Sequence, residues 1–254
     1  MWQYCYSSRN KEMANLLIEI GNTAVKAAWS DGSVLGKTFR YQGEKVMEFI
    51  ASLTDKQIPL VMAVVSARVI SSEEEKFLNS VSQYLIILDS AHPDVLSPYG
   101  IPDYLSYDRA SSLVAAKYLF KRKSCTVFDL GTTLTVDYLD SSGRYLGGNI
   151  SLGCRTRFKA LNRYSKALPL IDMPSDEKFP GDSLSTSIES GVISGIIFEI
   201  DGYIRTNPEN IVIFTGGDAI YFAKRMKNSI FVVCNLGLMG LAIITDDYVK
   251  KNIQ

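Results

Sequence analysis

The sequence contains little of what builds many catalytic and metal-binding sites. It has a single histidine, His92, which argues against a histidine-based triad and against a metal site made of several histidines. Its four cysteines are scattered and form no C-x-x-C pair. We therefore expect reduced thiols in a cytoplasmic protein, with Cys125 and Cys234 acting as small core residues because each lies in an apolar run.

Long apolar runs and an excess of one charge are also missing. No uninterrupted apolar run reaches the length of a membrane span, and the first twelve residues lack the apolar centre of a secretory signal. The 27 Lys and Arg residues balance 27 Asp and Glu residues, which argues against nucleic-acid binding as the main function. We expect neither a membrane nor a nucleic-acid partner, and we expect residues 1–13 to be an extension, with Met13 as an alternative start.

What the chain does contain is one pattern written twice. Residues 16–23 read LLIEIGNT and residues 126–133 read TVFDLGTT. Each copy is an apolar run, an acid, an apolar residue, a glycine and a pair of Asn or Thr residues, followed by a second β-like run. A length of 254 residues suits one large domain or two of ordinary size, and the repeat predicts a duplicated domain with two facing glycine turns.

The composition of the two turns points to a nucleotide. Backbone N–H groups and hydroxyls in a turn rich in Gly, Asn and Thr suit phosphate oxygens. The acids that precede the turns, Glu19 and Asp129, suit a hydrated Mg²⁺ carried by a nucleotide.

Hydrophobic periodicity and turn signals predict strands first and alternating helices and strands afterwards in both halves. Helix signals include Ser71 or Ser72 followed by three glutamates. In the first half we predict strands over 15–29 (two), 33–41, 60–65 and 84–88, helices over 44–53, 71–81 and 108–120, and a long loop over 91–107. In the second half we predict strands near 125–129, 134–139, 144–150, 210–214 and 231–233, and helices over 152–165, 189–206 and 237–247.

The order of the motifs resembles that of the type III pantothenate kinase family, within the acetate and sugar kinase/Hsp70/actin superfamily. The resemblance covers about residues 14–246. Its motifs, in order, are Glu19-Ile20-Gly21-Asn22-Thr23 with Lys26; Tyr99, Pro102, Leu105, Asp108 and Arg109; Asp129-Leu130-Gly131-Thr132; Gly147-Gly148-Asn149-Ile150-Ser151-Leu152-Gly153; Ala160-Leu161; Ala167-Leu168-Pro169; Ser190-Gly191; Thr215-Gly216-Gly217; and Leu236, Leu238, Gly240 and Leu241.

The resemblance implies an α/β fold made of duplicated ribonuclease H-like (actin-like ATPase) domains, each a mixed β-sheet flanked by helices, with a cleft between them. The halves would span residues 14–121 and 122–254. It implies ATP-dependent phosphorylation of pantothenate to 4′-phosphopantothenate, the first step of coenzyme A biosynthesis. It also implies a homodimer, Mg²⁺ and a monovalent cation, K⁺ or NH₄⁺.

The resemblance also assigns roles to residues. Asp108 would be the general base, and Tyr99, Ser106, Tyr107 and Arg109 would bind the substrate, with Arg109 holding its carboxylate. Asp129 would hold the monovalent cation and Glu19 the Mg²⁺, directly or through water. The residues assigned to ATP are Glu19, Gly21, Asn22, Thr23, Lys26, Gly131, Thr132, Thr133, Gly216 and Gly217.

Structural explanations remain open for several of these residues. Asp108 also suits the N-cap of the helix that follows it. Tyr99 also suits a loop anchor packed on the core, and Lys26 an exposed strand position. For Arg109 the alternative is a solvent-facing first-turn cation, which the helix dipole disfavours.

The chain departs from the family pattern at three places. Glu19 replaces Asp, which moves the carboxylate outward by roughly 1–1.5 Å. Ser106 replaces a glycine beside the expected base, and Leu184 stands where the family has a substrate-binding Thr. These departures keep two alternatives open, namely a catalytically weak nucleotide-binding regulator and a kinase or phosphatase acting on another small molecule.

The long apolar segment over residues 189–206 bears on assembly. Its isoleucines, Val192 and Phe198 cover more than one helical face, which predicts a homodimer through the helices of the second half. A fully buried helix within one domain explains the same pattern equally well.

Overall fold

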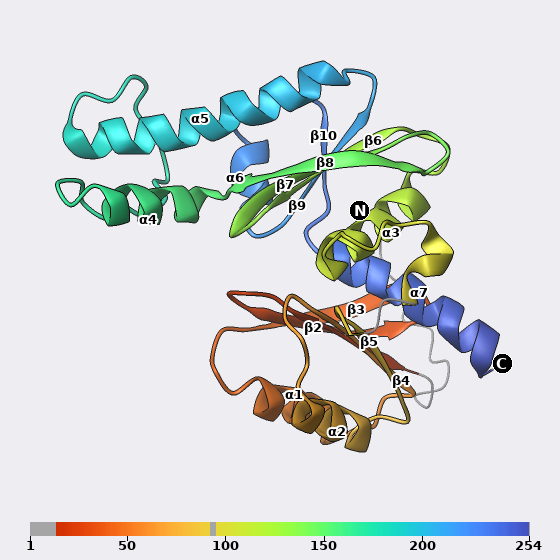
Figure 1. Ribbon diagram of the computed structural model, residues 1–254. Helices are drawn as coiled ribbons and strands as arrows, with labels where there is room; N and C mark the ends of the chain where they lie inside the picture. The colour runs from red at the N-terminus through yellow and green to blue at the C-terminus, as the bar shows by residue number, and fades with distance from the viewer. Residues whose placement is uncertain (1–13, 92–94, 254) are drawn as a thin grey trace. The chain divides into compact units, whose positions relative to one another are not determined.

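The computed structural model describes residues 14–91 and 95–253 (Figure 1). The expectations for residues 1–13 and for His92 lie outside the described residues. The described chain forms two compact units, one made of residues 14–115 together with 237–253 and the other of residues 116–236. Each unit is built around one five-stranded sheet.

The sheet of the first unit has the order β3-β2-β1-β4-β5. The first three strands pair antiparallel, and β4 and β5 extend the sheet in parallel with β1. The central strands β1 and β4 are apolar and buried on both faces, as expected for strands covered by helices on both sides. The strands are β1 (Asn15–Ile20), β2 (Val25–Asp31), β3 (Val34–Tyr41), β4 (Val61–Ser66) and β5 (Tyr84–Leu88).

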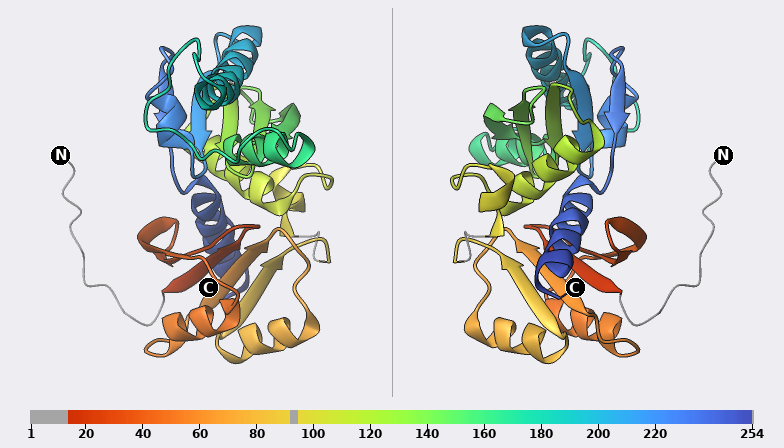
Figure 2. Two further views of the ribbon diagram at one scale, coloured as in Figure 1. Left: turned by 90° about the vertical axis from the view of Figure 1, so that its left-hand side faces the viewer. Right: turned by 90° about the vertical axis from the view of Figure 1, so that its right-hand side faces the viewer.

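Helices cover both faces of this sheet. Helices α1 (Val46–Thr54) and α2 (Ser72–Ser80) lie together on one face, as all three views show (Figures 1 and 2). Ile50 of α1 and Leu78 of α2 are fully buried and share a core with β1 and β4. The expected start of α2 is confirmed, since Ser71 and Glu74 form a reciprocal capping box.

On the other face, α3 (Tyr107–Leu119) and α7 (Leu236–Asn252) touch backbone to backbone. A Cβ atom at Gly240 of α7 would lie 1.7 Å from the carbonyl oxygen of Ser111 in α3. Only a glycine hydrogen fits in that space, so Gly240 sets how closely the two helices approach.

The second unit repeats the same sheet. Its order, β10-β9-β6-β7-β8, places an antiparallel meander beside two parallel strands, as in the first unit. The duplicated α/β fold expected from the repeat is therefore confirmed. The elements are β6 (Cys125–Leu130), β7 (Thr133–Leu139), β8 (Tyr145–Leu152), β9 (Ile211–Thr215), β10 (Ile230–Val232), α4 (Cys154–Tyr164), α5 (Leu184–Thr206) and α6 (Ala219–Ala223).

The core of the second unit lies between this sheet and α5. Phe128, Phe158, Phe214 and Phe222 are almost completely buried there. Along α5 the buried side chains include Ile188, Val192, Ile196, Ile200 and Ile204, four residues apart, so one stripe of the helix faces the sheet.

Three features differ from the sequence prediction. Helix α5 begins at Leu184, five residues before the predicted start, because Ser183 and Thr186 form a capping box there. The short helix α6 was not predicted. The last helix groups with the first unit, whereas the predicted halves, 14–121 and 122–254, place it in the second; its contact with α3 is the physical reason.

Two smaller expectations concern thiols and membranes. Cys125 is buried, as predicted, but Cys234 is exposed, so its apolar surroundings in sequence do not place it in the core. Within residues 14–91 and 95–253, no helix combines the length and the apolar content that crossing a bilayer requires.

Candidate functional site

The first glycine turn follows β1. The N–H of Gly21 donates to the carbonyl oxygen of Ala24 at 3.1 Å, which closes the turn. Asn22 and Thr23, between these residues, are exposed. The turn thus presents amide, hydroxyl and backbone groups at the end of a buried strand, an arrangement suited to phosphate oxygens.

Glu19 and Lys26 lie opposite each other on β1 and β2, close to this turn. Nζ of Lys26 is 3.1 Å from Oε1 of Glu19, and the two side chains are 26% and 19% exposed. The second carboxylate oxygen, Oε2, lies beside the first turn of α7, since a Cβ atom at Gly237 would be 3.1 Å from it. A helix start favours negative charge, so both oxygens of the carboxylate have positive surroundings.

Tyr99 ends a 3-10 turn, Ser97–Tyr99, in the loop before α3. Its hydroxyl donates to Oδ2 of Asp247 in α7 at 2.8 Å. Burial, followed by this hydrogen bond and the charges of Asp247 and Asp246, raises the pKa of Tyr99 above its usual value. The loop-anchor explanation of Tyr99 therefore has direct support.

The first turn of α3 holds the other residues expected to bind substrate. Ser106 is exposed and precedes the helix, and its carbonyl oxygen accepts the N–H of Ala110 at 2.9 Å. Tyr107 is the first helical residue, and burial, followed by the charges of Asp89 and Asp103, raises its pKa. Arg109 is only 9% exposed. The structure therefore does not place Arg109 on the solvent-facing side of the helix.

Asp108 lies inside the first turn of α3, so it is not the residue that precedes the helix. Its Oδ1 atom is buried and has no hydrogen-bond partner among the described residues. A buried carboxylate oxygen without a donor is costly, and each such atom in a native protein calls for an explanation, of which a catalytic role is one. The N-cap explanation of Asp108 is thus wrong, because an N-cap side chain accepts from the helix backbone.

The start of α7 links Glu19 to α3. A Cβ atom at Gly237 would lie 3.1 Å from Oε2 of Glu19 and 3.6 Å from Oγ of Ser112. Ser112 is one helical turn beyond Asp108, and residues four apart share a helix face. The structure thus brings the end of β1 and the Asp108 face of α3 to the same helix start.

The second glycine turn, after β6, is one residue shorter than the first. Gly131 donates to the carbonyl oxygen of Thr133 at 3.0 Å, and β7 begins at Thr133. Thr132 and Thr133 are exposed. In the first turn two residues, Asn22 and Thr23, lie between the hydrogen-bonded ends, whereas in the second turn Thr132 alone does. Thr133 is the first residue of β7.

Asp129 lies against the glycine pair that follows β9. Gly216 has a φ of +92° and a Cβ atom there would lie 2.4 Å from Oδ1 of Asp129, so both the backbone conformation and the space require glycine. Gly217 has no heavy atom within 4 Å of its Cβ position and is exposed. The structure thus brings Asp129, Gly131 and Gly216 together and leaves room at Gly217.

Several residues to which the sequence analysis gave no role also hold the second turn. The carbonyl oxygen of Thr132 accepts from the N–H of Gly153 at 3.0 Å and from Oγ1 of Thr156 at 2.6 Å. Asp218 donates its N–H to the carbonyl of Leu130 and accepts from Arg155 at 2.7 Å. Asp218 follows the Thr-Gly-Gly motif directly, which is the one sequence signal that points to it.

The carboxylates fit cations that a nucleotide brings with it. Among the described residues there is no group of three His, Cys, Asp or Glu side chains able to hold a metal ion. Mg²⁺ usually keeps several waters and binds one or two carboxylates together with substrate phosphates. Single carboxylates such as Glu19 and Asp129, each beside a phosphate-type turn, suit that mode of binding.

An apolar cavity of about 780 Å³ lies between α4 and α5 in the second unit. Leu161 and Tyr164 of α4 and Leu184, Ile188 and Val192 of α5 line it. Tyr164 is 85% exposed and Leu184 56%, so this face of the unit offers large apolar side chains to solvent. Exposed apolar surface of this kind marks interaction sites.

Comparison with known proteins gives the same assignment as the motifs. The family model for type III pantothenate kinase matches residues 15–206. The type III pantothenate kinase of Flavobacterium johnsoniae is 36% identical over 234 residues, which cover 89% of this chain and 95% of that protein.

Solved structures support the fold. A putative Baf family transcriptional activator from Campylobacter jejuni has a TM-score of 0.59 at 21% identity, covering 93% of this chain and 98% of its own. The activator of 2-hydroxyisocaproyl-CoA dehydratase from Clostridium difficile, solved with bound ADPNP, has a TM-score of 0.58 at 15% identity, with 95% and 100% covered. The family match and the sequence relative together show that this chain belongs to the type III pantothenate kinase family.

Proposed function

We propose that the chain phosphorylates pantothenate with ATP, giving 4′-phosphopantothenate in the first step of coenzyme A biosynthesis. The observation that carries this proposal is the pairing of two neighbours at the start of α3. Asp108 has a buried carboxylate oxygen without a donor among the described residues, and Arg109 beside it is 9% exposed. A substrate that has both a hydroxyl group and a carboxylate matches this pair, with the hydroxyl facing Asp108 and the carboxylate facing Arg109.

In the proposed reaction Asp108 accepts the proton of the substrate hydroxyl as that oxygen attacks the γ-phosphorus. The bond from this phosphorus to the β–γ bridging oxygen breaks, and ADP leaves. Phosphoryl transfer depends mainly on positioning and on electrostatic stabilisation, so one oriented base is sufficient. Arg109 holds the substrate carboxylate through its planar guanidinium. Tyr99, Ser106 and Tyr107 line the substrate site, Tyr99 through its ring.

ATP is proposed to be bound by the glycine turns of both units. The first unit contributes Gly21, Asn22, Thr23 and Lys26, with the Lys26 ammonium held next to its turn by Glu19. The residues proposed from the second unit are Gly131, Thr132, Thr133, Gly216 and Gly217. Bound ADPNP in the Clostridium difficile activator, which shares the fold, supports nucleotide binding on this scaffold.

Two cations complete the proposed site. Mg²⁺ supplies charge neutralisation on the phosphates, and Glu19 is proposed to hold it through water because one of its oxygens is already paired with Lys26. K⁺ or NH₄⁺ is assigned to Asp129, whose Oδ1 lies beside Gly216. One or two carboxylates beside bound phosphates are the protein ligands that Mg²⁺ usually has.

We also propose that the protein is a homodimer formed by a second copy seated on the α4–α5 face. The cavity there is apolar, and Phe198, farther along α5, is 64% exposed. Leu152, at the end of β8, is 47% exposed and adjoins the same cavity. A second copy of this face would remove these side chains from water, as homodimer interfaces do.

The experiment that tests the reaction is a coupled ADP-release assay with purified protein. We expect turnover with pantothenate and ATP, stimulated by K⁺ over Na⁺. The alcohol analogue of pantothenate, in which CH₂OH replaces the carboxylate, should react with a KM raised about tenfold or more, because it loses a charge-assisted pair with Arg109. ATP binding without turnover of pantothenate would contradict the proposal and favour a regulatory role.

A further inference from the structure

Asp89 is a buried carboxylate that has no role in the site proposed above. It follows the last residue of β5, and its side chain is 1% exposed. Oδ2 accepts the N–H of Ile70 at 3.0 Å, and Oδ1 accepts the N–H of Ala91 at 2.9 Å. One side chain thus fixes the backbone that leaves two different strands, β4 and β5.

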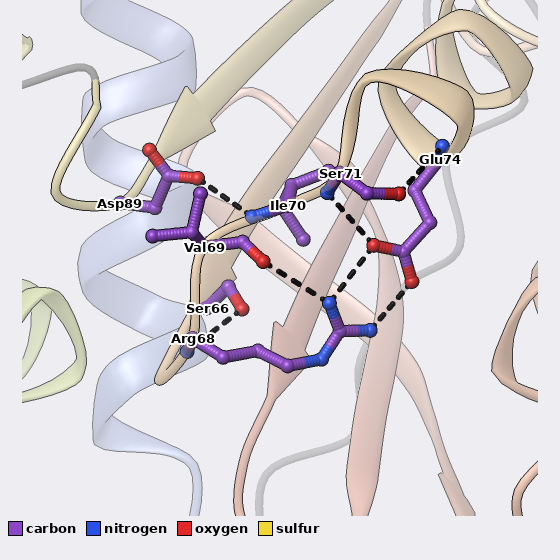
Figure 3. A network of polar contacts seen from close by, with 7 residues as sticks. All are labelled: Ser66, Arg68, Val69, Ile70, Ser71, Glu74 and Asp89. Carbon is purple, nitrogen blue, oxygen red and sulfur yellow. Dashed lines mark hydrogen bonds and ion pairs between the residues drawn. The ribbon is translucent and has the colours of Figure 1, made fainter.

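The peptide group between Val69 and Ile70 is held on both sides (Figure 3). Its N–H donates to Asp89, and its carbonyl oxygen accepts from Nη1 of Arg68 at 3.1 Å. The guanidinium of Arg68 is in turn held by both carboxylate oxygens of Glu74, at 2.8 and 2.6 Å. Asp89 is the buried end of this network, and Arg68 with Glu74 forms its more exposed end.

This network lies at the carboxyl edge of the first sheet. Strand pairing aligns Ile20 with Ser66 and Val65 with Leu88, so β1, β4 and β5 end at the same level. Ligands of open α/β sheets bind outside the carboxyl ends of the strands. Asp89 therefore lies along the same edge as the first glycine turn.

Asp89 is also coupled to the start of α3. Its charge contributes, after burial, to the raised pKa of Tyr107, so the carboxylate lies within electrostatic reach of that phenol. Tyr107 directly precedes Asp108 and Arg109. Asp89 thus holds the backbone after two strands and lies within electrostatic reach of the helix turn that carries the proposed base and carboxylate clamp.

We propose that Asp89 is a positioning residue for the pantothenate side of the reaction. By holding the Val69–Ile70 peptide group and Ala91, it fixes the backbone at the carboxyl edge of the sheet, within electrostatic reach of Tyr107. This inference rests on the proposed function, because the measurement is made on pantothenate turnover. A positioning role requires that the loss of Asp89 weakens the handling of pantothenate more than that of ATP.

The test compares Asp89→Asn with Glu74→Gln. An amide offers one acceptor oxygen and an NH₂ donor, so Asp89→Asn necessarily leaves one backbone N–H without its acceptor. We expect the KM for pantothenate to rise about tenfold, with the KM for ATP within about twofold of the wild-type value. Glu74→Gln breaks only the exposed part of the network and should leave both KM values within about twofold.

Two outcomes would overturn the positioning role. One is an unchanged KM for pantothenate in an Asp89→Asn variant that merely melts at a lower temperature. The other is an equal loss in pantothenate KM, ATP KM and kcat, which indicates general misfolding. If the wild-type enzyme itself does not turn over pantothenate, the proposed function fails instead, so the two failures are distinguishable.

A measurement on the unmodified protein covers the case in which Asp89→Asn does not fold. Amide hydrogen exchange at Ile70 and Ala91 is followed with no ligand, with ADP and with pantothenate. We expect pantothenate to slow exchange at both amides by about threefold or more, since a ligand bound at this edge of the sheet suppresses local opening, and ADP alone to leave it unchanged. Equal exchange with and without pantothenate would overturn the inference.

Discussion

The carboxylate of Glu19 and the ammonium of Lys26 meet across β1 and β2 at 3.1 Å, beside a turn that exposes Asn22 and Thr23. The equivalent pair in the second sheet is Asp129 and Thr135, with no lysine. The two repeats have thus kept the acid but diverged in its partner. In the first repeat this partner is a lysine, whose ammonium is held next to the glycine turn.

This difference predicts an asymmetric role for Lys26. We expect Lys26→Met to lower kcat/KM for ATP about 10- to 100-fold, because a charge-assisted contact to phosphate is lost. Glu19→Gln should have a smaller effect, since Lys26 remains but loses its anchor. Steady-state kinetics against ATP measure both. Lys37→Met, which alters an exposed lysine on β3, is the control; an equal effect of Lys37→Met and Lys26→Met would remove Lys26 from the site.

The orphaned oxygen of Asp108 gives the second prediction. Asp108→Asn should lower kcat about 10²- to 10⁴-fold, the usual contribution of a positioned base, while ATP affinity measured by calorimetry changes little. Asp103→Asn alters an exposed acid in the preceding loop and should be near wild type. Near-normal kcat in Asp108→Asn would show that the base lies elsewhere.

The Arg68–Glu74 pair predicts a pH-dependent contribution to stability. The hydrogen bond from Arg68, partly opposed by burial, lowers the pKa of Glu74 to about 2. A carboxyl group whose pKa is lowered by folding stabilises the fold at pH values above its unfolded-state pKa of about 4.3. This stabilisation is lost as the pH falls toward 2.

A partly exposed ion pair contributes about 1 kcal/mol to the free energy of unfolding. The Glu74→Gln variant should therefore melt about 2–4 °C below the wild type at pH 7. The gap should shrink between pH 5 and pH 2. Calorimetry at several pH values measures it. A gap of constant size across this range would show that the ion pair is not its source.

The contact between Gly240 and Ser111 gives a matched pair of glycine substitutions. Gly240→Ala would place a methyl group 1.7 Å from a backbone oxygen, so the helices must separate, and we expect a loss of about 1–3 kcal/mol in unfolding free energy. Gly202 of α5 is exposed, with open space at its Cβ position. Gly202→Ala should stabilise by about 0.5–1 kcal/mol through helix propensity. Denaturant titration measures both, and a loss of equal size in the two variants would contradict the packing explanation.

The proposed dimer face predicts how charge affects assembly. Phe198→Glu should convert the protein to a monomer at micromolar concentration, because burying an unpaired carboxylate in an apolar interface is costly. Ile58→Glu introduces the same charge at a residue that is 59% exposed in the first unit and should leave the mass unchanged. Light scattering gives the mass of each variant. A wild-type monomer, or a dimeric Phe198→Glu, would place the interface elsewhere or remove it.

Much of the fold was predictable because its signals are local. Apolar runs, hydrophobic periodicity and turn signals located ten strands to within a few residues, and the signal of Ser71 or Ser72 followed by three glutamates marked the start of α2 correctly. The start of α5 was missed because the apolar periodicity begins at Ile188, whereas the helix is initiated earlier by the side chains of Ser183 and Thr186.

The sequence motifs of the site could be predicted, but the residues that hold the motif side chains in place could not. The acid–glycine turns are contiguous in sequence, so Glu19, Gly21, Asp129 and Gly131 could be identified directly. Asp247, Asp89 and Arg155 act on residues that only the tertiary fold brings close, at sequence separations of up to 148 residues. The role of Asp247 as acceptor of the Tyr99 hydroxyl therefore could not be predicted from the sequence.

The return of α7 to the first unit has a consequence for synthesis on the ribosome. The second unit is one continuous segment, Ala116–Leu236, and all of it has been translated before Gly237 is added. The first unit, although begun first, lacks the helix that packs on Ser111 until residues 236–252 have left the exit tunnel. The part of the enzyme made earliest is therefore the last that can mature.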